Sequence, residues 1–159
     1  MKLKYWSGDK VTNLPENHVF VFGSNPEGRH GMGAAKQAMK WGAVYGKGRG
    51  LHGSTYALVT KNLKVGYVEA CTGITYEEAG KQSVSSQQLK YNMFEMYLVC
   101  VSNPDLTFIV PYKCDDTNLN GYSGHSMFSM FMGTLIDNNM KCPDNILFHN
   151  SLRGLAHAD

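Results

Sequence analysis

The sequence predicts an α/β protein in three layers, an α/β/α arrangement with a mostly parallel central sheet. Short apolar runs of strand length recur along the chain, as at 18–22 (HVFVF) and 56–60 (YALVT), and such runs are typical of strands covered on both faces. Helix-forming segments lie between these runs, and this alternation favours parallel strands. A length of 159 residues with 43% hydrophobic and 18% charged side chains suits one core, so we expect a single domain over residues 1–159.

The strands are expected wherever a short apolar run is bounded by turn or polar residues. These runs lie at residues 2–6, 18–22, 56–60, 107–110 and 145–149. The segment 46–54 (GKGRGLHGS) is expected to be a glycine-rich loop, and no definite element is predicted between 64 and 80.

Three helices are expected between the strands. The first covers 34–41 (AAKQAMKW), where helix formers run without a breaker up to Gly42. The second starts near the N-cap candidates of segment 83–86 (SVSS) and ends before Asn103-Pro104. The third covers 125–139. Helical spacing puts the following apolar side chains on the core faces of the second and third helices: Leu89, Met93, Met96, Tyr97, Cys100, Met127, Phe128, Phe131, Leu135 and Ile136.

Composition excludes several functional classes. The four cysteines, at 71, 100, 114 and 142, form no CxxC pair, so we expect no metal site. The net charge of +2 and the scattered Lys and Arg residues do not favour a nucleic-acid-binding surface. The opening MKLKYW lacks the apolar region of a signal peptide, and no run is long enough to span a bilayer. We therefore expect a reduced, cytoplasmic protein with no membrane partner and no cofactor.

Three polar loops follow predicted strand ends, at 23–33, from Lys61 onward and at 112–124. In an open parallel sheet these ends share one edge, where ligands bind, so the loops predict a cleft. The first loop (GSNPEGRHGMG) opens a helix, where free backbone N–H groups favour an anion and glycines allow its close approach. It matches neither the P-loop nor the GxGxxG pattern. Taken alone, it is equally well explained as a structural strand–turn–helix connection.

The order of several short motifs resembles the macrodomain family. GDKVT follows the first strand at 8–12, the strand HVFVFGSN ends at Asn25, where the family has an Asn-Ala-Ala-Asn-type motif, and HGMGAA opens a helix at 30–35. The later part is similar to the branch that contains terminal ADP-ribose glycohydrolases, with YALVTK at 56–61, TYE at 75–77, and VP at 110–111 followed by LNGY at 119–122. The chain also resembles small macrodomain-like proteins of tailed phages.

This resemblance implies a cleft that binds ADP-ribose or a derivative of it. The substrate-binding residues that it implies are Asp9, Ser24, Asn25, His30, Gly31, Met32, Gly33, Asn120, Gly121 and Tyr122. Asp9 would accept a hydrogen bond from the adenine amino group, and Asn25 would meet the distal ribose. The backbone of 31–33 would face the pyrophosphate, with His30 beside it, and the loop 120–122 would close over the phosphates and ribose.

The resemblance also implies a candidate nucleophile. Lys61 matches the lysine that attacks the anomeric carbon in the glycohydrolase branch, and an amine can form a Schiff base with a ring-opened sugar if burial lowers its pKa. The aspartate that assists this lysine aligns nearest Asn120, an amide that cannot act as a base. Asp115 or Asp116 would then have to substitute for it.

Two functions follow, and the sequence leaves both open. In the first, the chain is a hydrolase that acts at the distal ribose of an ADP-ribosylated protein or nucleic acid, or of ADP-ribose-1″-phosphate. In the second, it is a non-catalytic binder of ADP-ribose or of an NAD-derived signalling nucleotide. A binder could serve phage counter-defence in the host cytoplasm. A structural domain with an empty cleft is a third, weaker reading. In the simplest alternative, Asp9 is a turn residue, Lys61 a solvated strand-end lysine, and Asp115-Asp116 a surface turn.

Overall fold

The central element is a six-stranded sheet with helices on both faces. A computed structural model describes residues 2–155. The strands are β1 (Lys4–Trp6), β2 (His18–Ser24), β3 (Gly50–His52), β4 (Thr55–Val59), β7 (Thr107–Ile109) and β8 (Ile146–His149). Their order is β1-β8-β7-β2-β4-β3, and every neighbouring pair is parallel except β3 and β4. The predicted fold class, three layers around a mostly parallel sheet, is confirmed.

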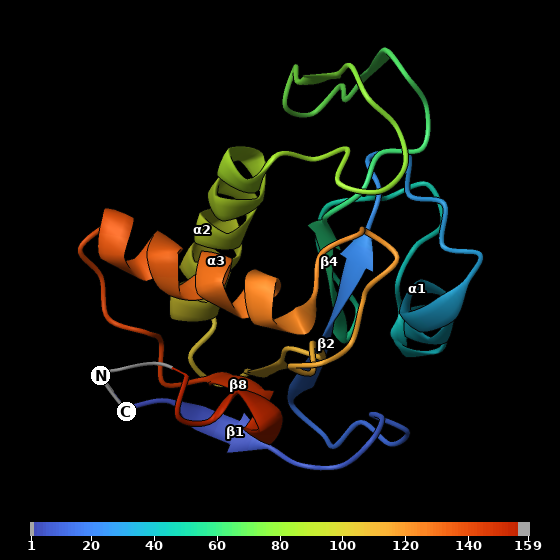
Figure 1. Ribbon diagram of the computed structural model, residues 1–159. Helices are drawn as coiled ribbons and strands as arrows, with labels where there is room; N and C mark the ends of the chain where they lie inside the picture. The colour runs from blue at the N-terminus through green and yellow to red at the C-terminus, as the bar shows by residue number, and fades with distance from the viewer. Residues whose placement is uncertain (1, 156–159) are drawn as a thin grey trace.

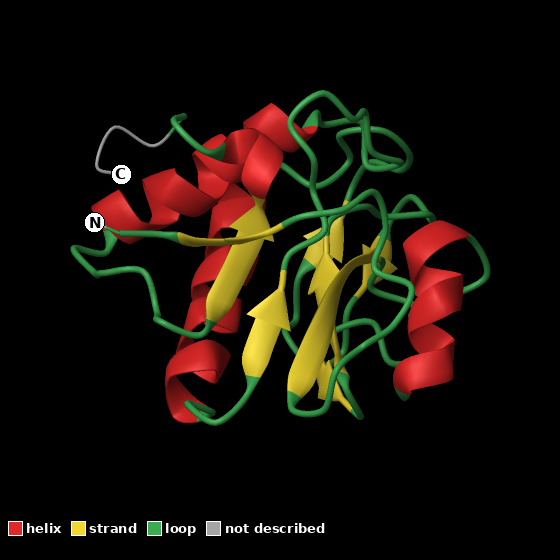
Figure 2. Cartoon of the chain, turned by 90° about the horizontal axis from the view of Figure 1, so that it is seen from below, coloured by secondary structure: helices red, strands yellow, loops and turns green. Residues whose placement is uncertain are grey.

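The helices form the two outer layers (Figures 1 and 2). Helix α1 (Gly33–Ala38), continued by a 3₁₀ turn at Met39–Trp41, covers one face, while α2 (Ser86–Ser102) and α3 (Gly124–Asp137) cover the other. Residues 19–22 of β2 are all apolar because both faces of this strand are buried. Val19 and Val21 enter the core beside α2 and α3, whereas Phe20 and Phe22 enter the smaller core beside α1.

The predicted core face of α2 is confirmed, since all five of its expected apolar side chains are buried. Among the N-cap candidates, Ser85 caps the helix: its Oγ accepts a hydrogen bond from the Gln88 backbone N–H at 3.2 Å. The helix ends at Ser102, directly before the Asn103-Pro104 pair, as that pair predicts. No helix in the described part of the chain is long and apolar enough to cross a membrane. None of the four cysteines forms a disulfide within the described residues, and Cys100 is buried in the core.

Four details correct the sequence-based predictions. The glycine-rich segment 46–54 contains the edge strand β3, which pairs antiparallel with β4. Segment 64–80 contains a small hairpin, β5 (Tyr67–Val68) and β6 (Thr75–Tyr76). Ile136 is expected in the core but is 76% exposed. Consecutive helix residues point about 100° apart, so when Phe131 and Leu135 face the core, Ile136 points toward solvent. The first strand is shorter than expected and begins at Lys4.

Candidate functional site

The three polar loops meet in one cleft of 530 Å³ at the carboxyl edge of the parallel strands. The first runs from the end of β2 into α1, the second continues β4, and the third follows β7 and leads to α3, passing beside the tip of β2 in Figure 1. Their lining segments are 23–25, 29, 31–35, 60–61, 63, 111–112 and 117–120, with residue 45 from the neighbouring loop. The predicted convergence of these loops is confirmed.

Seven of the expected site residues line this cleft. They are Ser24, Asn25, Gly31, Met32, Gly33, Lys61 and Asn120. The two asparagine side chains are already bonded within their own loops. Asn25 accepts from the Arg29 N–H at 2.9 Å and donates to the Arg29 carbonyl at 3.1 Å, so its amide closes the turn. Asn120 accepts from the Tyr122 N–H at 2.8 Å. Both amides therefore line the cleft and at the same time shape its wall through these hydrogen bonds.

The expected aspartates lie outside the lining. The Lys113 ammonium donates to Asp9 Oδ1 at 2.7 Å and lies 3.6 Å from Asp116 Oδ2. The hydrogen bond from Lys113 lowers the pKa of Asp9, and Asp115 is an exposed neighbour in the same loop. A lysine that the sequence analysis did not consider therefore holds two of these carboxylates, and none of the three joins Lys61 in the cleft.

The remaining expected residues have packing roles. His30 is buried behind the cleft wall, with Nε2 3.0 Å from the Lys47 carbonyl and its ring edge-to-face with Phe22 at 5.1 Å. The Tyr122 hydroxyl donates to the Val84 carbonyl at 3.0 Å, which ties the third loop to the start of α2. Gly121 packs against the segment 81–82. His30, Gly121 and Tyr122 therefore support the loops without lining the cleft.

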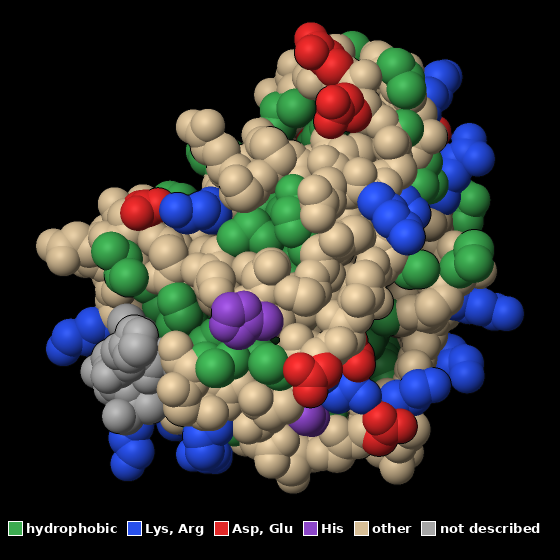
Figure 3. Space-filling model, viewed as in Figure 1, with side chains coloured by type: hydrophobic (Ala, Val, Ile, Leu, Met, Phe, Trp, Pro, Cys, Tyr) green, Lys and Arg blue, Asp and Glu red, His purple; other side chains and the backbone are tan. Residues whose placement is uncertain are grey.

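The cleft is electropositive. Its charged lining residues within the described chain are Arg29 and Lys61, and no carboxylate lines it. Residues 31–35 also line it, and none of their backbone N–H groups donates a hydrogen bond to another described residue. Lys36, Lys40 and Lys47, which belong to α1 and the segment after it, are exposed. Figure 3 shows several Lys and Arg side chains on the side of the molecule where α1 lies. Cations and unpaired N–H groups together favour an anion.

The rim of the cleft is apolar. Met32, Tyr45, Leu63 and Leu119 are large hydrophobic side chains that line it and are nevertheless exposed. Exposed apolar side chains gathered at one site are typical of a ligand-binding surface. Of these, sequence reasoning identified only Met32, because Tyr45, Leu63 and Leu119 come from three separate loops that only the fold brings together. The cleft therefore suits a ligand with both an anionic and an apolar part.

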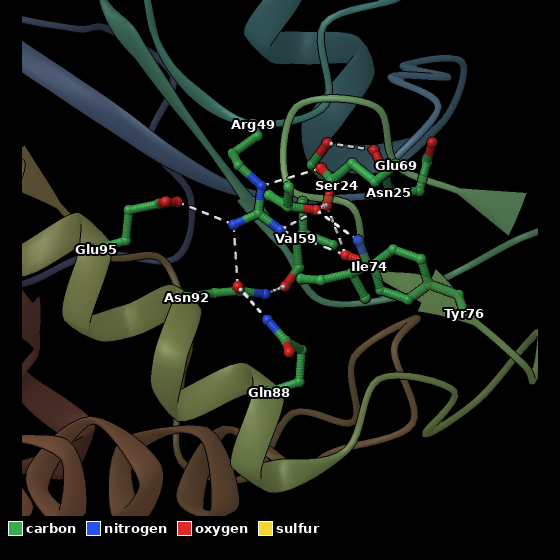
Figure 4. A network of polar contacts seen from close by, with 11 residues as sticks. Ser24, Asn25, Arg49, Val59, Glu69, Ile74, Tyr76, Gln88, Asn92 and Glu95 are labelled. Atoms are coloured by element: carbon green, nitrogen blue, oxygen red, sulfur yellow. Dashed lines mark hydrogen bonds and ion pairs between the residues drawn. The ribbon is translucent and has the colours of Figure 1, made fainter.

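A network of polar contacts around Arg49 reaches the end of β4 at Val59 (Figure 4). The Arg49 guanidinium donates two hydrogen bonds to Glu69, at 2.9 and 3.0 Å, and one each to Asn92 and Glu95 at 3.0 and 2.9 Å. Asn92 in turn donates to the Val59 carbonyl at 2.9 Å, two residues before Lys61. The network thus joins the 62–80 segment, α2 and the end of β4.

Glu69 is the acceptor at the centre of this network. Thr72 Oγ1 and Tyr76 Oη each donate to it at 2.8 Å, in addition to Arg49. Burial alone would raise the pKa of Glu69, but the hydrogen bonds from Arg49, Thr72 and Tyr76 lower it overall. The sequence showed no sign of this network, because its members are spread from residue 49 to residue 95 and no motif links them.

Comparison with known proteins gives little further information. No protein-family model matches the chain, and no curated protein sequence matches it. Among solved structures, the chain is similar to one described as a protein of unknown function from Bacteroides thetaiotaomicron, at 13% sequence identity and a TM-score of 0.48. That match covers 94% of this chain and 98% of the other. This likeness gives no information on the chemistry of the cleft.

Proposed function

We propose that this protein binds ADP-ribose, or a closely related anionic nucleotide, in the cleft and does not cleave it. The observation that carries this proposal is the charge of the lining: among the described residues, Arg29 and Lys61 line the cleft and no carboxylate does. The unpaired N–H groups of 31–35 would bind the oxygen atoms of the diphosphate. The volume of 530 Å³ is in the usual range for small-molecule sites.

The apolar rim supports a nucleotide over a simple phosphate. A nucleobase offers a flat apolar face, and Tyr45 with Met32 and Leu119 would give it a surface to stack on. The resemblance of the chain to macrodomains, described from the sequence, selects ADP-ribose among nucleotides with two phosphates. The same cleft would accept the ADP-ribosyl group of a modified protein or nucleic acid, or would sequester a free signalling nucleotide.

Hydrolysis is the second candidate, and the position of Lys61 in the cleft is the observation that favours it. An amine that attacks an anomeric carbon also needs a group that accepts and returns a proton. The carboxylates expected for this role, Asp115 and Asp116, are outside the cleft, and Asp116 lies near Lys113. The arrangement therefore supports binding better than bond cleavage.

Calorimetric titration with ADP-ribose tests the binding proposal. We expect wild-type protein to bind, and Lys61→Gln to bind about tenfold more weakly, because it loses a charged hydrogen-bond donor to the ligand. Lys64→Gln is the matched control, since Lys64 is exposed nearby and does not line the cleft; its affinity should equal that of the wild type. Absence of binding at millimolar ADP-ribose would overturn the proposal.

Incubation with an ADP-ribosylated protein separates the two candidates. A binder retains the modified protein and releases no ADP-ribose over hours. Release that occurs with the wild type and is abolished by Lys61→Gln would instead identify a hydrolase that uses Lys61 as its nucleophile. The Lys64→Gln variant again serves as the control for a change in surface charge.

A further inference from the structure

The floor of the cleft contains an unusual glycine. Gly23 is an interior residue of β2 and does not have a positive φ, so its backbone conformation does not require glycine. Glycine inside a strand weakens the strand and often marks a close approach. A Cβ at this position would lie 3.0 Å from Thr60 Oγ1 and 3.3 Å from Tyr112 Oη. The absence of a side chain thus keeps open a small space that two hydroxyl groups face.

Within the described residues, neither hydroxyl has a hydrogen-bond partner. Tyr112 Oη is buried and makes no hydrogen bond to any residue described. Thr60 is also buried, and no hydrogen bond from its Oγ1 is found within residues 2–155. Buried hydroxyls are nearly always paired, so an unpaired one at the floor of a cleft indicates a group that pairs with a ligand. Burial raises the pKa of Tyr112, which keeps its proton and makes it a donor.

The exposed fraction of the lining side chains increases from the floor of the cleft to its rim. Thr60 and Tyr112 are 2% and 6% exposed, whereas Met32, Tyr45 and Leu119 at the rim are 60% or more exposed. A ligand whose base contacts the apolar rim and whose phosphates meet the N–H groups of 31–35 would direct its far end to the floor. Lys61 directly follows Thr60 in the chain and also lines the cleft. The floor therefore faces the end of the ligand remote from the base.

We infer that the Gly23, Thr60 and Tyr112 floor is a hydroxyl-recognition subsite, which takes a hydroxyl of the terminal sugar in a nucleotide with a sugar beyond its diphosphate. This inference rests on the proposed function and narrows it to ligands that carry such a sugar. A sugar hydroxyl both accepts and donates, so it can accept from Tyr112 Oη and donate to Thr60 Oγ1 in one position. A nucleoside diphosphate such as ADP lacks this group and leaves both hydroxyls unpaired.

The test compares ADP-ribose with ADP in calorimetric titrations of three variants. Wild-type protein should prefer ADP-ribose by about tenfold or more, because a site built to bond a hydroxyl discriminates against a ligand without it. Tyr112→Phe removes only the hydroxyl and should lower ADP-ribose affinity about tenfold while ADP affinity stays constant. Gly23→Ala should also lower the affinity for ADP-ribose and leave that for ADP constant, because the added methyl group occupies the space between Thr60 and Tyr112.

A matched control and a ligand-free measurement complete the test. The buried Tyr97 hydroxyl donates to the Phe131 carbonyl at 3.1 Å, away from the cleft, so Tyr97→Phe should lower the melting temperature and leave the preference for ADP-ribose unchanged. Tyr112→Phe without ligand should melt at the wild-type temperature or above it, since its hydroxyl has no protein partner to lose. A lower melting temperature for Tyr112→Phe would overturn the subsite.

The two proposals fail in different ways. If the wild type binds ADP and ADP-ribose equally, or if Tyr112→Phe weakens both equally or neither, nucleotide binding stands and the hydroxyl subsite is overturned. If the wild type binds neither ligand, the proposed function is overturned, and the assignment of a terminal sugar to the floor is overturned with it.

Discussion

At the scale of single residues, the buried Arg49–Glu69 pair is expected to have a large effect on stability. The Glu69 side chain is 3% exposed and that of Arg49 is 11% exposed, and two hydrogen bonds join them. A charge that loses its buried partner costs far more than a surface ion pair contributes, because water cannot replace the lost contact. Removing one member should therefore affect the whole fold.

Glu69→Gln is expected to lower the free energy of unfolding by about 3–5 kcal/mol, since it leaves the Arg49 charge without its buried partner. Urea denaturation measures this difference. Glu95→Gln is the control, because Glu95 bonds the same guanidinium but its side chain is 39% exposed, and the loss should be below about 1 kcal/mol. Equal losses in the two variants would show that burial does not set the strength of these contacts.

At the scale of elements, the two glycine-rich loops are fastened to each other. The Gly46 N–H donates to the Gly28 carbonyl at 2.8 Å, and the backbone of Gly48 crosses the first loop so closely that a Cβ on it would lie 2.1 Å from the Asn25 carbonyl oxygen. The sequence predicts both loops but not their contact. The second loop therefore fixes the position of the first, which forms one wall of the cleft.

Gly48→Ala should destabilise the protein by about 1–3 kcal/mol, or displace the 25–30 loop, because backbone atoms cannot move aside as a flexible side chain can. Gly31→Ala is the matched control, since Gly31 lacks a positive φ and a Cβ there meets nothing within 4 Å. Thermal unfolding compares the two. Similar melting temperatures for Gly48→Ala and Gly31→Ala would argue against the loop contact.

At the scale of the whole molecule, Glu69 makes stability depend on pH. The pKa of Glu69 is lower in the folded protein than its ordinary value, so the unfolded chain binds more protons as pH falls. The stabilisation from Glu69 is therefore complete above the unfolded pKa, about 4.3, and is lost as pH falls through the lowered folded value. Asp9 has a lowered pKa as well and acts in the same direction.

We expect the free energy of unfolding to decrease below about pH 5, and to decrease less steeply for Glu69→Gln, which lacks this titrating group. Urea denaturation midpoints between pH 7 and pH 3 give both curves. If the curves for the wild type and Glu69→Gln run parallel, another carboxylate controls the acid sensitivity of the fold.

Local patterns predicted most of the fold. The apolar runs and the helical spacing place five of the six strands of the main sheet and all three helices near their observed positions, because burial on both faces of a sheet requires continuous apolar residues. The edge strand β3 and the β5–β6 hairpin were not predicted. Both are short: β3 begins with a glycine, and Val68 of β5 is exposed. Pairing with a neighbouring strand stabilises them, and their own composition does not predict a strand.

The sequence by itself determined the sheet, its helices and the edge at which three loops meet, because hydrophobic spacing and turn residues act over a few positions. Only the tertiary structure decided which side chains line the cleft. Lys113 reaches across 104 positions of the chain to bond Asp9, and Tyr112 and Thr60 face one space because Gly23 leaves it open. Such contacts depend on the packing of distant segments, for which neither residue type nor spacing carries a signal.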